Sequence, residues 1–191
     1  MTLSEFNNYL KENITDSDFL IKDNVLIKYI GQGGDVVVPY GVTRIRNNAF
    51  LNCNTITSIT LPNDIEFIGA KAFAGCDGLA DRDGFVIVKY VLHSYCGEDA
   101  DVNVPNGVGY IGNGAFSGKS IVSITIPASV STIEHQAFIS CRKLTKVKIL
   151  NGNTKISDTA FMWSDKVTIY SPAGGTVEAF ANEKGIPFVA E

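Results

Sequence analysis

Residues 42–79 read VTRIRNNAFLNCNTITSITLPNDIEFIGAKAFAGCDGL, and one order of residue types occurs twice in this stretch. Each copy has a β-branched residue, two spacers, an isoleucine, three spacers, Ala-Phe, two spacers and a cysteine. The Ala-Phe pairs of the two copies are Ala49-Phe50 and Ala72-Phe73, which gives a period in the low twenties. Such a fixed period is typical of a solenoid, in which each repeat buries its apolar face against its neighbours.

The prolines support this period. A short β-rich run precedes each of five prolines, and proline, which has no N–H to donate, is expected where a strand stops. These prolines are Pro39, Pro62, Pro105, Pro127 and Pro172, and Leu150 takes the same place after KVKI. The spacing from the isoleucine to the alanine is the same in each copy, from Ile45 and Ala49 to Ile156 and Ala160. This constancy predicts a packed inner layer.

A second, longer repeat is superimposed on the first. Residues 19–50 match residues 85–116 without a gap. The first part of each unit alternates apolar and polar residues around a turn, which predicts β-hairpins near 19–31 and 85–97. We expect these hairpins to decorate the solenoid between coils.

Both ends depart from the repeat. Residues 2–14 have capping-box spacing at Thr2 and Glu5 and one apolar face, so we predict an N-terminal helical cap over residues 1–18. A frayed terminus is the alternative. Residues 171–191 are predicted to form a C-terminal cap, with Thr176 as N-cap, Val177 and Phe180 inward, and Gly185 as the stop. A final strand is expected in the segment IPFVA.

The unit xxLxxIxIPxxVxxIgxxAFxxC resembles the BspA-like class of leucine-rich repeats. One copy contains Ile68, Ala72, Phe73 and Cys76, and another contains Ile133, Ala137, Phe138 and Cys141. The resemblance covers residues 19–190. It implies an α/β leucine-rich-repeat solenoid, β-rich, of about five coils of roughly 22–23 residues each, with two inserted hairpins and helical caps at both ends. It also implies a single domain over 1–191, with repeats over 19–170, and a largely bacterial family associated with the cell surface, protein binding and adhesion.

Composition and charge restrict the partners. Of 191 residues, 45% are hydrophobic and 19% charged, as in a folded protein. The net charge of -4 provides no basic footprint for nucleic acid. No apolar run is long enough to cross a bilayer, and the N-terminal stretch shows no signal peptide. We therefore expect no membrane insertion, a monomer, and either a cytoplasmic chain or a portion of a longer secreted precursor.

No arrangement of residues points to catalysis, a cofactor or a metal site. Cys53, Cys76 and Cys141 share one repeat position, which favours buried reduced thiols, although a disulfide between Cys53 and Cys76 stays open. His93 and His135 lack a nucleophile or carboxylate at a recognisable spacing and are expected to be at or near the surface. The acidic residues at 81–83 and 98–101 lack EF-hand spacing, so a solvated loop is favoured over a weak calcium site.

The remaining candidate is the outward face of the stacked strands. Period-two counting from Ile59 and Leu61 places hydroxylic residues outward, with a lysine pair and a tyrosine towards the C-terminal end. The candidate binding residues are Ser58, Thr60, Asn103, Ser123, Thr125, Lys146, Lys148, Thr168 and Tyr170. We predict a non-enzymatic module that binds a protein through this face. The alternatives are a carbohydrate- or matrix-binding adhesin using Tyr170, Tyr90 and Tyr95, and a structural spacer in a larger surface protein.

Overall fold

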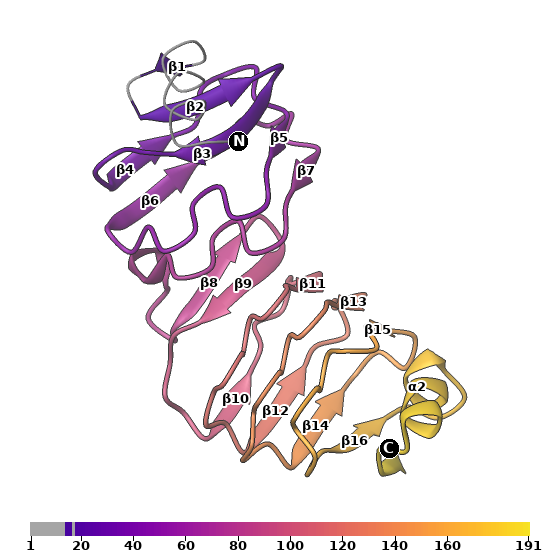
Figure 1. The fold of residues 1–191 in the computed structure, drawn as a ribbon. Helices are drawn as coiled ribbons and strands as arrows, with labels where there is room; N and C mark the ends of the chain where they lie inside the picture. Colours follow the sequence, from indigo (N-terminus) through magenta and orange to yellow (C-terminus); the bar gives the residue numbers. More distant parts are fainter. Residues whose placement is uncertain (1–13, 17) are drawn as a thin grey trace. The chain divides into compact units, whose positions relative to one another are not determined.

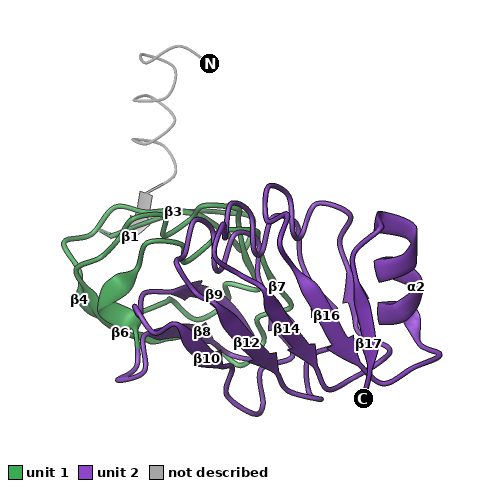
Figure 2. Cartoon of the chain, turned by 90° about the horizontal axis from the view of Figure 1, so that it is seen from below, with its two compact units in different colours: residues 1–80 green, residues 81–191 purple. Residues whose placement is uncertain are grey.

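The computed structural model describes residues 14–16 and 18–191, which fall into two compact units, residues 1–80 and 81–191 (Figure 2). The helix predicted over residues 2–14 lies outside the described residues except at its end. There, Ile14–Asp16 forms strand β1, which pairs antiparallel with β2 (Phe19–Lys22), so the expected helical cap does not extend to residue 18. The expectation of one continuous solenoid domain stays a prediction, and each unit is described by itself.

Unit 1 contains two sheets. β2 pairs antiparallel with β3, and β3, β5 and β7 then pair in parallel, while β4 and β6 form a separate parallel pair. Its strands after β2 are β3 (Val25–Tyr29), β4 (Gly34–Val37), β5 (Arg44–Ile45), β6 (Ile56–Thr60) and β7 (Phe67–Ile68), and the 3-10 helix η1 (Asp77–Leu79) follows. Ile59 of β6, predicted to point inward, is only half-buried, whereas Val36, aligned with it on β4, is buried.

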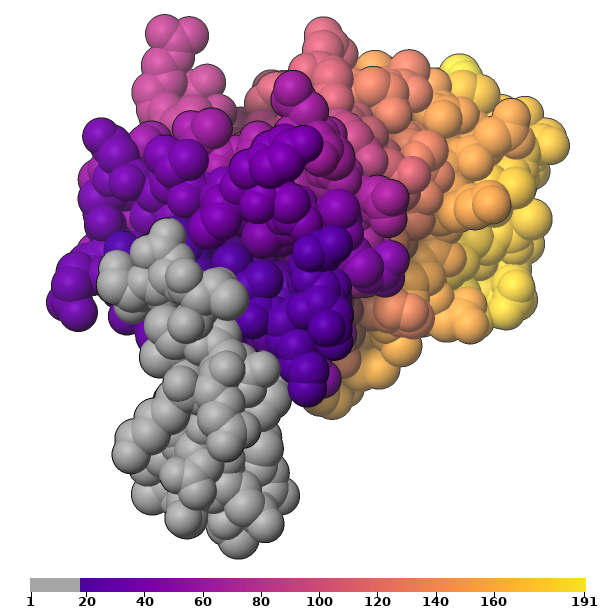
Figure 3. Space-filling view, turned by 90° about the horizontal axis from the view of Figure 1, so that it is seen from above, coloured from indigo at the N-terminus to yellow at the C-terminus, as the bar shows by residue number. Residues whose placement is uncertain are grey.

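Unit 2 repeats this plan with more layers (Figure 1). One sheet has the order β10-β12-β14-β16-β17, all in parallel, and the other has the order β15-β13-β11-β9-β8. Its strands are β8 (Phe85–Val88), β9 (Val91–Tyr95), β10 (Asp101–Asn103), β11 (Tyr110–Ile111), β12 (Ser123–Ile126), β13 (Thr132–Ile133), β14 (Lys146–Ile149), β15 (Lys155–Ile156), β16 (Thr168–Ser171) and β17 (Phe188–Ala190). Within unit 2 the colours of the space-filling view follow sequence order from magenta to yellow, as coils stacked in order require (Figure 3).

The antiparallel strand pairs are part of the sheets. β9 pairs antiparallel with β8 on one side and parallel with β11 on the other, and β3 does the same with β2 and β5. The expectation that the hairpins merely decorate the solenoid is therefore wrong. The reason is that each hairpin supplies a strand whose free edge can accept the next coil.

The constant Ala-Phe pair has a backbone role. The Phe116 N–H donates to the Ala137 carbonyl of the next coil at 2.8 Å, and the Phe138 N–H donates to the Ala160 carbonyl at 2.8 Å. The tyrosine of the second hairpin joins the same series, because the Tyr95 N–H donates to the Ala115 carbonyl at 2.9 Å. These bonds satisfy buried backbone groups at every layer, which fixes the spacing that the repeat shows.

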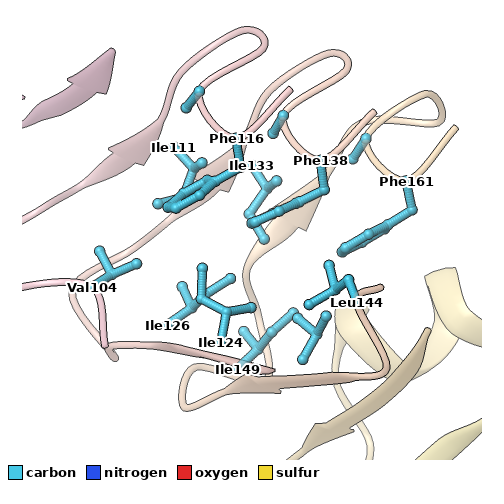
Figure 4. Packing of buried hydrophobic residues seen from close by; sticks show 14 of the residues in the cluster. Val104, Ile111, Phe116, Ile124, Ile126, Ile133, Phe138, Leu144, Ile149 and Phe161 are labelled. Carbon is cyan, nitrogen blue, oxygen red and sulfur yellow. The ribbon is translucent and has the colours of Figure 1, made fainter. Parts of the chain in front are cut away.

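Aromatic rings stack along the inside of each unit. In unit 2 the rings of Phe116, Phe138 and Phe161 lie nearly parallel, with centroids 5.0 Å and 5.2 Å apart, and aliphatic side chains of the strands face them (Figure 4). The Tyr95 ring packs against that of Phe116, tilted by 34° with the centroids 5.3 Å apart, so the hairpin continues the series of aromatic contacts. Offset aromatic stacking and burial of these large side chains together stabilise the core.

The cysteine position of the repeat supplies a hydrogen-bond donor to the coil before it. The thiol of Cys76 lies 3.0 Å from the Phe50 carbonyl oxygen, and that of Cys141 lies 3.0 Å from the Phe116 carbonyl oxygen. One coil later Ser164 takes the position, and its hydroxyl donates to the Phe138 carbonyl at 2.6 Å while accepting from the Cys141 N–H at 2.9 Å. A small side chain with a donor therefore fits this position.

Ser164 tests this role. Replacing Ser164 by alanine is expected to lower the free energy of unfolding by about 1–3 kcal/mol, because the buried Phe138 carbonyl and Cys141 N–H keep only the long 3.4 Å hydrogen bond to each other. Ser164→Cys, which copies the residue found at this position in three earlier coils, should recover part of the loss. Urea denaturation of the three proteins measures the difference. Wild-type stability of the alanine variant would show that the hydrogen bonds are dispensable.

The C-terminal helix α2 (Thr176–Lys184) lies beside β16 and β17 and buries Val177 and Phe180, as predicted (Figures 1 and 2). Gly185 ends it with a left-handed backbone (φ 65°). The predicted N-cap is wrong by one residue: Gly175 is the N-cap, and the Thr176 hydroxyl donates to the Thr154 carbonyl at 3.0 Å. A Cβ at residue 175 would clash with the Gly152 carbonyl, so only glycine fits there.

Within the described part of the chain, no helix has the length and apolar character that a membrane span needs.

Candidate binding surfaces

The outward residues of unit 2 form two rows across adjacent strands. Asn103, Thr125, Lys148 and Tyr170 are aligned in register from β10 to β16, and Tyr170 is followed by Val189 of β17. The second row aligns Asp101, Ser123, Lys146 and Thr168. All these residues are exposed or half-exposed, whereas the alternate positions Ile124, Val147 and Ile169 are buried. The seven predicted residues of unit 2 thus lie on one sheet face, called the strand face below.

Charged and aromatic groups of the strand face contact one another at its C-terminal end. The Lys146 ammonium lies over the Tyr170 ring, 4.9 Å from its centroid. The Lys148 ammonium lies 2.6 Å from the Glu191 carboxylate. The hydrogen bond from Lys148, followed by the charges of Lys148 and Lys146, lowers the pKa of Glu191 below its usual value. Sequence patterning missed Glu191, because it lies outside the repeat and reaches the face through β17.

The remaining predicted residues, Ser58 and Thr60, lie in unit 1. Both are exposed on β6, next to Asp35 and Val37 of β4. The Ser58 hydroxyl donates to the Asp35 carboxylate at 2.7 Å, and the Ser123 hydroxyl of unit 2 donates to Asp101 at 2.5 Å in the same arrangement. These two serines are therefore engaged within the chain, which reduces what they can offer to a partner.

Tyr90 and Tyr95 of the second hairpin were predicted to contact a ligand, and the structure places them in different environments. Tyr95 is only 1% exposed and stacks in the core, so it cannot meet a ligand. Its hydroxyl reaches the Asp99 carboxylate at 3.2 Å. Tyr90 is 54% exposed, and its ring lies 5.6 Å from that of Tyr110. The period-two count could not separate these tyrosines, because it does not include the aromatic stack.

The cysteines are free thiols. Burial raises the pKa of Cys76 to about 12 and that of Cys141 to about 11, so both are protonated and poorly nucleophilic at neutral pH. Cys53, also predicted to be buried, is half-buried, with its pKa raised chiefly by burial. These environments favour a packing role over a reactive one.

The histidines occupy contrasting environments. His135 is exposed, and its Nδ1 lies 2.6 Å from the Ser157 hydroxyl. His93, predicted at or near the surface, is 4% exposed in β9, where both faces of the strand are covered. Burial lowers the pKa of His93 to about 4. His93 is therefore a neutral core residue at pH 7.

The acidic residues near the second hairpin serve local structure. Asp81 accepts from the N–H groups of Asp83 and Phe85 at 3.0 Å and 2.9 Å, which is a turn arrangement. Among residues 14–16 and 18–191, no group of three or more His, Cys, Asp or Glu side chains is placed to hold a metal ion.

A hollow that the sequence reading missed lies on the turn before β16. Arg142, Trp163, Asp165 and Lys166 line it, and its volume is about 630 Å³. Trp163 is 64% exposed. One feature of the sequence could have indicated this site. Trp163, the chain's single tryptophan, lies two residues after the repeat phenylalanine, a position where other coils have small or polar residues.

Comparison with known proteins places the repeat in a family. The family described as "BspA type Leucine rich repeat region" matches residues 28–83 and 86–183 in six copies. Similar solved structures include a leucine-rich repeat protein of T. pallidum, TpLRR, at 24% identity and a TM-score of 0.48, covering 87% of this chain and 91% of that chain. A leucine-rich cell surface protein of Faecalibacterium prausnitzii is 21% identical with a TM-score of 0.41, covering 83% and 59%.

The pneumococcal vaccine antigen PcpA is 15% identical with a TM-score of 0.45, covering 91% of this chain and 48% of that chain. Curated proteins gave no match. The six copies span the strands, turns and aromatic stack described above, and they include most of both units. The chain belongs to the BspA-type leucine-rich repeat family.

Proposed function

We propose that this chain is a non-enzymatic module that binds another protein through the strand face. Family members are repeat modules, generally without catalytic activity, of the bacterial surface-protein type. The observation that carries the proposal is the exposed end of the strand face, where Lys146 and Lys148 flank Tyr170 in two aligned rows. The proposal also includes the number of coils and the helical caps expected from the sequence. In it, α2 would act as the C-terminal cap that covers the core of the last coil.

Physical chemistry supports a protein as the partner. Parallel strands present their side chains at regular spacing on a broad surface, and curved repeat proteins bind through such surfaces. Tyrosine contributes disproportionately to protein interfaces, because it buries a large rigid ring and keeps a hydroxyl for hydrogen bonding. Lys148 is paired with Glu191, so Lys146 is the lysine that would favour carboxylates on the partner and raise its association rate.

A triple variant tests the surface. Lys146→Ser, Lys148→Thr and Tyr170→Thr replace each residue with one found in the same row, so strand propensity is retained. A protein partner recovered with the wild-type chain from extracts of the source organism is expected to bind the variant at least about thirtyfold more weakly, since loss of a hot-spot residue costs about 2 kcal/mol or more. Surface plasmon resonance measures the dissociation constants.

Lys155→Thr is the matched control. Lys155 is exposed on the opposite sheet and is aligned with Thr132, so the substitution removes a lysine without touching the strand face. Affinity should stay within about twofold of wild type. Unchanged affinity of the triple variant would exclude this end of the strand face as the binding surface.

A further inference from the structure

We propose that the hollow around Trp163 binds a glycan that carries carboxylate groups. The hollow lies on the turn side of unit 2 and is lined by Arg142, Trp163, Asp165 and Lys166. This site is distinct from the strand face, because none of these four residues belongs to β12, β14 or β16. It does not rest on the proposed protein-binding function.

The backbone of Trp163 is the first indication of a function. Its φ is 59°, in the left-handed region that bulky residues rarely adopt. The same turn position in the other coils has positive φ as well: Asn52, Gly75 and Gly118 tolerate it better than tryptophan, and Ser140 is at least small. Strain that persists where a smaller residue would fit is characteristic of functional positions.

The exposure of Trp163 supports the same conclusion. Its side chain is 64% exposed, so the core does not require it. The exposed indole offers a flat apolar surface on which the C–H face of a pyranose ring can stack, gaining both burial of apolar area and an aromatic contact. The hollow of about 630 Å³ is open, because all four lining residues are exposed, so a saccharide would lie across it rather than be enclosed.

The polar groups beside the indole match a polyhydroxylated ligand. Arg142 and Lys166 can only donate hydrogen bonds, whereas the Asp165 carboxylate can only accept them. Sugar hydroxyls both donate and accept, so vicinal hydroxyls can use both kinds of group. Among the described residues, these three side chains make no hydrogen bond or ion pair, which leaves their polar groups available. An acidic peptide can donate to Asp165 only through its backbone N–H groups, so it is the comparison ligand that tests the contribution of the sugar hydroxyls.

The charge of the hollow favours carboxylates on the sugar. Two cationic residues face one anionic residue, and Lys143, next to Arg142, is exposed as well. This local excess of positive charge contrasts with the chain's net charge of -4. A guanidinium binds a carboxylate bidentately, so Arg142 is the expected contact for a uronate group.

Because Trp163 is the chain's single tryptophan, its fluorescence reports on the hollow. Hexagalacturonate and a hyaluronan octasaccharide are the probes, with maltohexaose as the neutral saccharide and octaglutamate as the acidic peptide. At least one uronate probe is expected to shift the emission at millimolar concentration and to bind at least about tenfold more tightly than either comparison ligand. No shift with either uronate, or equal binding of octaglutamate, would overturn the proposal.

Variants locate the site by isothermal titration calorimetry. Trp163→Asn copies Asn52 and is expected to weaken uronate binding roughly tenfold while leaving the melting temperature unchanged or higher, because asparagine tolerates the left-handed backbone. Arg142→Gln should weaken binding and reduce its salt dependence. Tyr40→Ser, which removes a 91% exposed aromatic outside the hollow, should bind as wild type does. Full uronate affinity in a folded Trp163→Asn protein would contradict the assignment.

Discussion

Replacing Phe138 by alanine is expected to lower the free energy of unfolding by about 3–5 kcal/mol. Phe138 is fully buried, and its ring is stacked between Phe116 and Phe161, at interplanar angles of 13° and 6°. Truncation removes apolar burial and two ring contacts and leaves a cavity between layers that the backbone hydrogen bonds hold at fixed spacing. Because domains are typically stable by only about 5–15 kcal/mol, this loss is a large fraction of the total.

Urea denaturation followed by circular dichroism measures the effect. Phe138→Leu keeps much of the volume and should cost clearly less than the alanine variant. Met162→Ala serves as the surface control, since Met162 lies next to Phe161 but is exposed, and its substitution should change stability by less than about 0.5 kcal/mol. A loss below about 1.5 kcal/mol for Phe138→Ala would mean that neighbouring coils collapse into the space.

The repeat period predicted the fold because it is a packing constraint. The Ala-Phe spacing reflects a backbone bond and a ring contact that recur in every layer, from Phe116 to Phe161. The proline positions marked strand ends for the same reason, since proline cannot donate to a ladder. The period could not predict how each hairpin pairs with the rest of the sheet. The alternation of apolar and polar residues shows that a strand exists, but it does not show which edge of a sheet the strand joins. In the structure the Tyr95 ring packs against Phe116 at an interplanar angle of 34°, a contact that the alternation does not reveal.

The candidate sites were predictable to a smaller extent. Period-two counting placed Lys146, Lys148 and Tyr170 on one exposed face, because side-chain direction alternates along any strand. It could not find Glu191, which lies beyond the repeat, or the hollow at Trp163, which Arg142 joins from the turn of the preceding coil. Turn residues have no simple period, so only the three-dimensional fold brings them together.

His93 is expected to make the protein less stable in acid. Its pKa in the folded chain is about 4, below the ordinary value of 6.5, and burial is the cause. Between these two values the unfolded chain binds a proton that the folded chain does not, so the free energy of unfolding decreases as pH falls through this window. The shift corresponds to a loss of roughly 3 kcal/mol, which is complete only below pH 4 and does not occur above pH 6.5.

The equivalent position of the first hairpin supplies the test. Ile27 takes the place of His93 in the first copy of the long repeat, so His93→Ile introduces the residue that the other copy carries. The variant should lose less stability than wild type between pH 7 and pH 4, by roughly 3 kcal/mol, in urea denaturation at each pH. Carboxylates that titrate in this range affect both proteins alike and cancel in the difference. If the free energy of unfolding fell equally with pH in wild type and His93→Ile, the prediction would be wrong. The imidazole would then accept a proton in the folded chain, and burial would not lower its pKa.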